Sequence, residues 1–552
     1  MLIVQRGSIV DANLGSMDVL CTDKTGTLTE AKIRLEKHTD PQGQPSERVL
    51  ELAYLNSFFE TGLKSPLDEA ILAHEEIDVS AWKKIDEVPF DFERRRVSVL
   101  LDKGTGRLLV VKGAPDEILG LCKRYEEQGN PAQIPLDKAA GEQIHAVQVD
   151  LENEGFRVLG IAWREVPADH PHAVVGDETE LIFAGFAAFL DPPKESAGAA
   201  LAALKNNGIS VKIVTGDSEL VTQHVCGQLN IPVTGVLTGK EMAEMDDSAL
   251  QARVTTANLF CRVNPGQKER IVLALKARGH VVGYLGDGIN DAPSLHAADV
   301  GLSVDSAVDV AKEAADMILL DRDLHVLHDG VLEGRRTFGN IMKYIMMGTS
   351  SNFGNMFSMA GAALFLPFLP MLPTQILLNN VLYDMSEVPI PLDEVDPEEL
   401  RRPRVMDIGF IRNFMLVIGP ISSVFDFLIF YLMLHALNAD EKLFQTGWFI
   451  ESLCTQVLVI FVIRTRGNPF KSRPHPALIA ASLGIATLGA LLPFTPLGTY
   501  FGFVRPPAQF YFILGGMALA YLLVVQIAKK RFYRWYENNH PVRPPPGLNE
   551  AS

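Results

Sequence analysis

Short apolar runs alternate with amphipathic stretches through the first 335 residues of the chain. Runs with the length of buried strands lie at residues 17–21, 211–214, 281–285, 300–304 and 317–320. Two of the stretches between them, residues 196–207 and 218–229, predict helices, and Gly208 ends the first. Strands that alternate with helices are typical of a doubly wound, parallel α/β sheet.

A mixed α and β pattern interrupts this series between residues 37 and 185. An apolar strand at residues 181–190 leads back to the regular series and ends at Asp191, which two prolines follow. We therefore predict that residues 1–36 and 186–335 form two parts of one domain, and that residues 37–185 form an inserted α+β domain.

From about residue 336 the chain becomes mostly apolar. Six stretches of roughly 20 residues, the length that a bilayer requires, lie at 341–366, 371–391, 413–436, 447–464, 477–494 and 509–528. The second and fourth are the most polar, since they contain Asp384 and Glu451. We predict a transmembrane domain of six helices over residues 336–535, followed by a disordered, proline-rich tail at 536–552.

Basic clusters predict how these helices cross the membrane. They lie at residues 401–404, 464–473 and 529–531, and positive loops face the cytoplasm. An even number of spans puts the large N-terminal head on the same side. We predict a multi-pass protein of the cytoplasmic (inner) membrane, with its head and its C-terminus in the cytoplasm and the lipid bilayer as a partner.

Composition narrows the possible functions. The formal net charge of −17 argues against nucleic acid as a partner. The five cysteines have no paired spacing, so neither a disulfide framework nor a zinc site is expected. No secretory signal is expected at the start, because the first ten residues lack a long apolar core.

An aspartate within three residues of a glycine follows three of the predicted strands: Asp23, Asp217 and Asp287. Parallel strands lie about 4.8 Å apart, so carboxylates at neighbouring carboxyl ends converge on one crevice. Clustered carboxylates repel one another unless a cation lies among them, and hard oxygen ligands suit Mg²⁺. The pattern predicts a phosphoryl-transfer site; the alternative is polar loops that cap helices.

The run after the first predicted strand reads Asp23-Lys24-Thr25-Gly26-Thr27-Leu28-Thr29. It resembles the phosphorylation motif of the P-type ATPases. The resemblance implies a phosphorylation domain with a haloacid dehalogenase-like, Rossmann-type fold, in which Asp23 attacks ATP and becomes phosphorylated. It also implies that Asp23, Asp287 and the backbone carbonyl of Thr25 hold Mg²⁺.

Other residues match further parts of the family's phosphorylation site. The resemblance implies that Thr215, Gly216 and Asp217 contact phosphate and that Lys268 stabilises the transferred phosphoryl group. Asn290 and Asp291 complete the motif that begins at Asp287. A phosphatase of the same fold is disfavoured, because those enzymes have an aspartate two residues after the nucleophile, where this chain has Thr25.

The inserted segment contains the expected ATP-binding residues. Lys112-Gly113-Ala114-Pro115-Asp116 resembles the family's Lys-Gly-Ala-Pro-Glu, with Asp in place of Glu, and implies that Lys112 faces the nucleotide. By the same resemblance, Phe90 stacks on adenine and Arg157 lies near the phosphates. Phe90 has an alternative role in the core. Asp68 and Glu69 match a nucleotide-domain helix start, which we interpret first as helix capping.

Polar residues inside the first two predicted spans suggest an ion path. Asn352 and Asn355 share one helix face, and so do Asn380 and Asp384. These oxygens suit a hard cation; the alternative is interhelical hydrogen bonding. The two spans resemble those of the bacterial Mg²⁺-importing type IIIB branch, which implies Mg²⁺ transport. A pump for Ca²⁺ or another cation is the alternative.

The resemblance starts just before the phosphorylation motif. The family's actuator domain, its Thr-Gly-Glu-Ser motif and its first four spans are not recognisable upstream of Asp23. We therefore expect the C-terminal portion of an ATP-driven Mg²⁺ pump. The alternative is a nucleotide-binding membrane fragment that cannot transport, or a half-enzyme whose N-terminal half is a separate chain.

Overall fold

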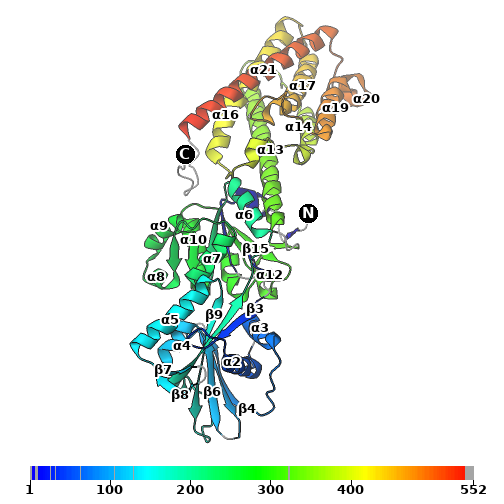
Figure 1. Cartoon of the computed structure of the whole chain (residues 1–552). Helices are drawn as coiled ribbons and strands as arrows, with labels where there is room; N and C mark the ends of the chain where they lie inside the picture. Colours follow the sequence, from blue (N-terminus) through cyan, green and yellow to red (C-terminus); the bar gives the residue numbers. More distant parts are fainter. Residues whose placement is uncertain are drawn as a thin grey trace. The chain divides into compact units, whose positions relative to one another are not determined.

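The computed structural model describes residues 3–5, 10–24, 27–30, 33–62, 64–91, 93–104, 106–127, 130–320 and 324–540. They divide into two compact units (Figure 1). The sheet unit falls within Met1–Gly7, Asp18–Lys205 and Ile209–His328. The helical unit falls within Ser8–Met17, Asn206–Gly208 and Asp329–Ser552.

The first sheet of the sheet unit has the strand order β1-β16-β15-β14-β2-β11-β13-β12. Its strands are β1 (Ile3–Gln5), β2 (Val19–Thr22), β11 (Ser210–Val214), β12 (Val236–Thr238), β13 (Leu259–Cys261), β14 (Val282–Leu285), β15 (Val300–Val304) and β16 (Met317–Leu319). All described pairs are parallel except β1 with β16. The predicted parallel sheet is therefore confirmed, with an antiparallel strand added at one edge.

Helices connect these strands: α6 (Ala197–Asn206), α7 (Glu219–Gln228), α8 (Gly239–Ala243), α9 (Asp247–Thr256), α10 (Pro265–Ala277), α11 (Ala292–Ala297) and α12 (Asp309–Ala314). The start of α10 is set by its sequence. Asn264 caps the helix in a capping box with Gln267, and Pro265 occupies the first turn. Ile271 and Leu275, four positions apart, are buried, which fixes the rotation of α10 about its axis.

The second sheet has the order β4-β5-β6-β9-β10-β7-β8, and β3 also pairs with β10. Its strands are β3 (Arg34–Thr39), β4 (Lys83–Asp91), β5 (Arg96–Asp102), β6 (Arg107–Gly113), β7 (Cys122–Glu127), β8 (Asn130–Pro135), β9 (Arg157–Val166) and β10 (Leu181–Leu190). The boundary predicted at residue 185 falls inside β10. The strand continues because Phe189 still pairs with Arg157 of β9.

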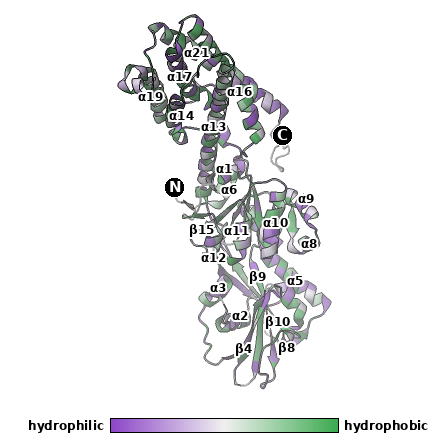
Figure 2. Ribbon diagram, turned by 180° about the vertical axis from the view of Figure 1, so that it is seen from behind, coloured by the Kyte–Doolittle hydropathy of each residue, from purple (hydrophilic) through white to green (hydrophobic). Residues whose placement is uncertain are grey.

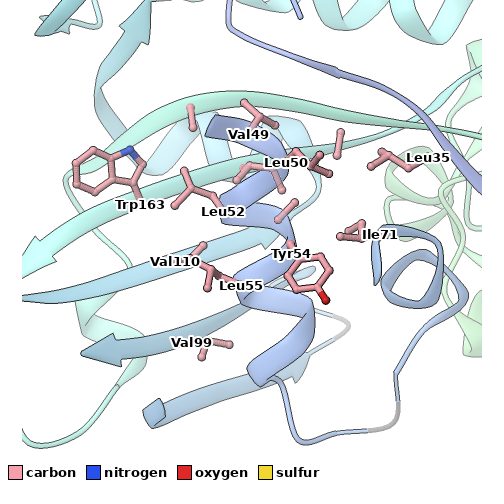
Figure 3. Packing of buried hydrophobic residues seen from close by; sticks show 14 of the residues in the cluster. Leu35, Val49, Leu50, Leu52, Tyr54, Leu55, Ile71, Val99, Val110 and Trp163 are labelled. Carbon is pink, nitrogen blue, oxygen red and sulfur yellow. The ribbon is translucent and has the colours of Figure 1, made fainter. Parts of the chain in front are cut away.

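Helices cover the second sheet: α2 (Glu47–Phe59), α3 (Pro66–His74), α4 (Pro115–Leu121) and α5 (Lys138–Asn153). Figure 3 shows α2 lying across the strands, with Leu52 and Leu55 directed toward Val110 and Val99. These four side chains are fully buried. The second sheet and its helices therefore share a well-packed core, which fixes the positions of β4, β6 and α3.

The helical unit consists of α1 (Val10–Ser16), most of α13 (His325–Ala362), α14 (Pro373–Glu387), α15 (Pro397–Leu400), α16 (Ile408–His435), α17 (Glu441–Leu458), α18 (Ile460–Ile463), α19 (Pro476–Leu491), α20 (Pro496–Tyr500) and α21 (Ala508–Asn539). Among the described residues, four helical stretches are long and apolar enough to cross a membrane: 408–435, 441–463, 476–494 and 508–539. Their hydrophobic character is visible in Figure 2.

Two of the six predicted spans are not among these four stretches. The stretch predicted at 371–391 contains α14, which has 15 residues, fewer than the roughly 20 that a bilayer requires. The stretch predicted at 341–366 lies in α13, which is long enough at 38 residues but carries several serines and asparagines that reduce its hydropathy.

The end of the last helix also differs from the prediction. The final span was expected to end at residue 528 and a disordered tail to begin at 536, but α21 continues to Asn539. Long charged side chains at 529–531 are good helix formers, and no proline interrupts the helix before residue 541. The rest of the predicted tail, residues 541–552, lies outside the described part of the chain.

Candidate functional site

The three predicted aspartates follow adjacent strands of the first sheet. Strand β2 lies between β11 and β14 and pairs with both in parallel. Asp23 follows β2, Asp217 follows β11 and Asp287 follows β14, so all three come from the same edge of the sheet. The Asp23 N–H donates to Leu285 O at 3.0 Å, which ties the start of the loop to β14.

Lys268 from the first turn of α10 lies among these carboxylates. Its Nζ is 2.6 Å from Asp23 Oδ2 and 2.8 Å from Asp291 Oδ1. The side chain is only 5% exposed. Burial by itself lowers the pKa of Lys268, but the two carboxylates outweigh burial and raise the net pKa, so the ammonium stays charged.

Asp291 is held in place from three directions. Its Oδ1 accepts from Lys268 and from the Tyr284 hydroxyl at 2.9 Å, and its Oδ2 accepts from the Gly288 N–H at 3.1 Å. A Cβ atom at Gly286 would lie 2.6 Å from the Cβ of Asp291, so the glycine makes room for this side chain. Asp291 therefore orients Lys268 toward Asp23.

The carboxylates of this cluster, Asp23, Asp287 and Asp291, outnumber the single ammonium of Lys268, so its excess charge is negative. Burial raises the pKa of Asp23 to about 6; Lys268 opposes this shift, and Asp291 and Asp217 add to it. Burial, followed by Asp23 and Asp291, raises the pKa of Asp287 to about 7. Both carboxylates would be stabilised by a cation between them, and their oxygens suit Mg²⁺.

No group of three or more His, Cys, Asp or Glu side chains with metal-binding geometry occurs within the described residues. Mg²⁺ does not require one, because it usually takes one or two carboxylates and completes its shell with water and phosphate oxygens. Asp23 and Asp287 fit that pattern. Thr25, the third predicted ligand, lies outside the described residues, as does Gly26.

Asp217 is neutralised by two cations from different segments. Its Oδ2 is 2.5 Å from Lys24 Nζ, and its Oδ1 is 3.3 Å from Nε of Arg157 on β9. Burial raises the pKa of Asp217, but Arg157 and Lys24 lower it more, so the net pKa is well below its usual value. Arg157 thus connects the second sheet to the segment Thr215–Asp217. Thr215 is buried, whereas Gly216 and Asn290 are exposed.

A second connection joins the two sheets where the chain passes between them. The Thr29 hydroxyl donates to Asp191 Oδ2 at 2.6 Å. Beside it, the Glu30 N–H donates to Pro192 O at 2.9 Å and the Lys194 N–H donates to Leu28 O at 2.8 Å. The two connecting segments therefore form a small hydrogen-bonded pair.

Besides Arg157, the four other predicted nucleotide-binding residues divide into a buried pair and an exposed pair. Lys112 of β6 forms an ion pair with Asp68 of α3, and its Nζ also donates to Ser57 Oγ at 2.9 Å. Asp68 also forms a capping box with Ser65, in agreement with the capping interpretation. Phe90 on β4 is 50% exposed, and Glu69 is exposed.

The sequence reasoning missed Arg262. Its φ of 52° is unusual for a residue with a side chain, and its N–H donates to Asp217 O at 2.9 Å. Its guanidinium bonds Asp116 Oδ2 at 2.9 Å and Glu219 Oε2 at 3.1 Å. Arg262 directly precedes the run that contains Lys268, but nothing in the sequence links it to Asp116, 146 positions away.

A cavity of about 520 Å³ lies in the helical unit. Its polar lining consists of Asn352, Asn355, Asn379, Asn380, Trp448 and Ser452. Three of the four predicted ion ligands therefore line one cavity. The fourth, Asp384, is exposed and is not part of the lining, because it lies one helical turn beyond Asn380. Asn379 lines the cavity instead, with its Nδ2 3.4 Å from Phe449 O.

Two family models match the chain. One is described as "P-type ATPase, cytoplasmic domain N" and matches residues 38–196. The other is described as "Cation transporting ATPase, C-terminus" and matches residues 368–531. Between them the two models match more than half of the chain, which belongs to the P-type ATPases, so the predicted family is confirmed.

Among curated proteins, the chain is 48% identical over 537 residues to a magnesium-transporting ATPase, P-type 1, of Salmonella typhimurium. It is 47% identical over 535 residues to the protein of that name in Escherichia coli. Each alignment covers 95% of this chain and 59% of the relative. The chain is 27% identical over 568 residues to a calcium-transporting ATPase of Bacillus subtilis. It spans about three fifths of the length of the magnesium-transporting relatives.

Proposed function

We propose that this chain is the catalytic and C-terminal transmembrane portion of an ATP-driven Mg²⁺ pump that works through an aspartyl-phosphate. The observation that carries the proposal is the ion pair of Lys268 with Asp23, 2.6 Å apart at the end of the central strand β2. An aspartate in this position can act as a nucleophile while the ammonium stabilises the transferred group. A haloacid dehalogenase-like fold of the first sheet is part of the proposal.

In the proposed reaction, one carboxylate oxygen of Asp23 attacks the γ-phosphorus of ATP. The new O–P bond forms as the bond to the β-phosphate oxygen breaks, and ADP leaves with the electron pair. Lys268 pairs with the transferred phosphoryl group, and the segment at Thr215–Asp217 contacts its oxygens. Asp23, Asp287 and the Thr25 carbonyl would hold Mg²⁺, which supplies neutralising charge to the phosphates when bound.

The second sheet is the proposed ATP-binding domain. Phe90 offers an exposed ring for stacking on adenine, which is worth about 1–3 kcal/mol per base in nucleic-acid complexes. Arg157 already lies against the phosphate motif through Asp217. Lys112 is engaged with Asp68, so we assign these two residues to shaping the pocket, and Glu69 to its exposed rim.

The cavity of the helical unit is the proposed cation site. Amide oxygens of Asn352, Asn355 and Asn380 are hard ligands for Mg²⁺; Asp384, the fourth predicted ligand, lies outside the cavity lining. The names of the most similar relatives support Mg²⁺ as the transported ion; a pump for Ca²⁺ or another cation is the alternative. Six spans in the inner membrane with a cytoplasmic head complete the proposal.

Phosphorylation can be tested with the purified chain, γ-³²P-labelled ATP and Mg²⁺, followed by acid quench. The proposal predicts a label that is stable in acid, removed by hydroxylamine and absent from Asp23→Asn. Asp169→Asn, at an exposed aspartate in a loop, should retain the label. Absence of label in the unmodified chain, with ATP still bound, would contradict catalysis by this chain and favour a fragment that binds nucleotide without turnover.

A further inference from the structure

Two acidic side chains meet inside the helical unit. Asp426 on α16 is 3% exposed and Glu451 on α17 is 0% exposed. Their carboxyl groups lie within hydrogen-bonding reach of each other. Two ionised carboxylates do not share a buried site of this kind without a compensating charge.

The hydrogen bonds of Asp426 suit an ionised carboxylate. Its Oδ2 accepts from the Ser358 hydroxyl at 2.6 Å, and its Oδ1 accepts from Nε1 of Trp448 at 2.8 Å. Each oxygen therefore has a donor from a different helix. An indole N–H can only donate, so the contact with Trp448 requires an acceptor at Oδ1.

Glu451 has the opposite surroundings. Among the described residues, no donor hydrogen-bonds to either carboxyl oxygen of Glu451. In the part of the chain that the structure describes, no Lys, Arg or His acts electrostatically on the pair. The other titratable groups that interact with it there are Cys454 on α17 and Tyr521 on α21. A buried carboxylate without donors is costly, whereas a protonated carboxyl can donate its O–H to Asp426.

We propose that Asp426 and Glu451 form a proton-binding site, in which Glu451 carries one proton and donates it to Asp426. The site lies beside the cavity of the helical unit, because Trp448 and Ser452 line that cavity while Trp448 also bonds Asp426. It takes a ligand, a proton, that differs from the cation proposed for the asparagines. The inference does not depend on phosphorylation of Asp23.

Infrared spectroscopy of the purified chain in detergent tests the proposal, because a protonated carboxyl has a C=O stretching band that a carboxylate lacks. At pH 8 exposed carboxyls, with pKa values near 4, are ionised. We expect Glu451→Gln to remove the intensity of one protonated carboxyl. Asp426→Asn should keep that band and shift its frequency, because Glu451 stays protonated but loses its acceptor.

Two controls keep the outcome readable. Glu394→Gln, which changes a carboxyl in a loop of the same unit, should leave the band unchanged. In the unmodified chain, transfer to D₂O should shift the band, which tests the exchangeable proton without any substitution. An unchanged band in Glu451→Gln would overturn the proposal. So would a band that disappears in Asp426→Asn alone, or one that appears in the unmodified chain only after chelators remove bound cations.

Discussion

Single residues carry most of the proposed chemistry, and Lys268 is the clearest case. It is buried, charged and held between Asp23 and Asp291, so its ammonium is already oriented before substrate arrives. A donor fixed in this way stabilises developing charge without the cost of reorganisation at the moment of reaction.

Replacing Lys268 with alanine should reduce the rate of phosphorylation at Asp23 by about 10²–10³-fold, the usual effect of removing one such donor. The rate of ³²P incorporation at saturating ATP measures the effect. Lys276→Ala is a matched control on the same helix, since that lysine contacts Ala297 O and Asp299, away from the site. Equal losses in the two variants would contradict the proposed role of Lys268.

Arg262 should act on ATP binding more than on chemistry, because it joins Asp116 of α4 to Glu219 of α7. The ion pairs are partly exposed, and exposed pairs are worth up to about 1 kcal/mol. Arg262→Ala should therefore raise the apparent KM for ATP by up to about fivefold and leave the maximal phosphorylation rate nearly unchanged. Arg253→Ala, an arginine on α9, is the control.

The sequence predicts the residues that lie within short motifs and misses those that act through the fold. Asp23, Asp217 and Asp287 could be placed together because each follows a strand of one parallel sheet. The partnership of Lys268 with Asp291 was not predicted, because it depends on how α10 packs. Arg262 was missed because its partner Asp116 lies 146 positions away, on α4.

At the scale of elements, two helices of the helical unit approach very closely. A Cβ atom at Gly354 of α13 would clash with Ser422 Oγ and lie 2.9 Å from Gly419 O of α16. Small residues permit such contact between membrane helices. The glycine is therefore a condition for the packing of α13 against α16.

Gly354→Ala should lower the thermal stability of the chain in detergent, because overpacking costs about 1–3 kcal/mol. Gly348→Ala, on the same helix with no atom within 4 Å of the added Cβ, should instead leave stability unchanged or raise it, because alanine favours a helix by about 0.5–1 kcal/mol over glycine. Thermal unfolding of both variants gives the comparison. Equal effects would contradict the close contact.

Helix α3 is fastened to the second sheet by the pair of Asp68 with Lys112. Burial raises the pKa of Asp68, but Lys112, Ser65 and Ser57 together lower it by more than burial raises it, so the net pKa is below its usual value. A lowered pKa stabilises the fold above the unfolded value of about 3.9, and the effect is lost as pH falls through the folded pKa.

Asp68→Asn should therefore destabilise the chain at pH 7 by about 3 kcal/mol, because it leaves a buried ammonium short of a partner. The difference from the unmodified chain should shrink as the pH is lowered below about 4. Denaturant unfolding at several pH values measures it. Glu69→Gln, at the exposed neighbouring position, should change little; a difference for Asp68→Asn that does not depend on pH would contradict the assignment.

Element types were predicted better than membrane spans. Apolar runs located β2, β11, β14, β15 and β16 within two residues, because buried parallel strands have continuous apolar sequences. The short β12 and β13, of three residues each, give no such pattern. In the apolar half six stretches were predicted, but over the described residues four helical stretches are both long and apolar enough, since polar residues and a short helix break the pattern.

For the whole molecule, one divalent cation should be required in the sheet unit. Chelation of Mg²⁺ with EDTA should abolish ³²P incorporation at Asp23, because the Asp23 and Asp287 carboxylates then repel the phosphates. Restoring Mg²⁺ should recover the label, whereas Ca²⁺ should recover less, because it prefers more ligands at longer distances. Labelling that persists in EDTA would contradict a metal site at these residues.

The hydrogen-bonded pair of connecting segments, fastened by Thr29 and Asp191, limits how the inserted domain can move. One segment leads to β3 and the other returns from β10, so two connecting segments, rather than one, join the second sheet to the first (Figure 1). Two adjacent connecting segments that are hydrogen-bonded to each other can bend together, but they resist twisting about their common axis. In the proposed reaction, this double connection would limit rotation of an ATP molecule bound to the inserted domain as its γ-phosphate approaches Asp23.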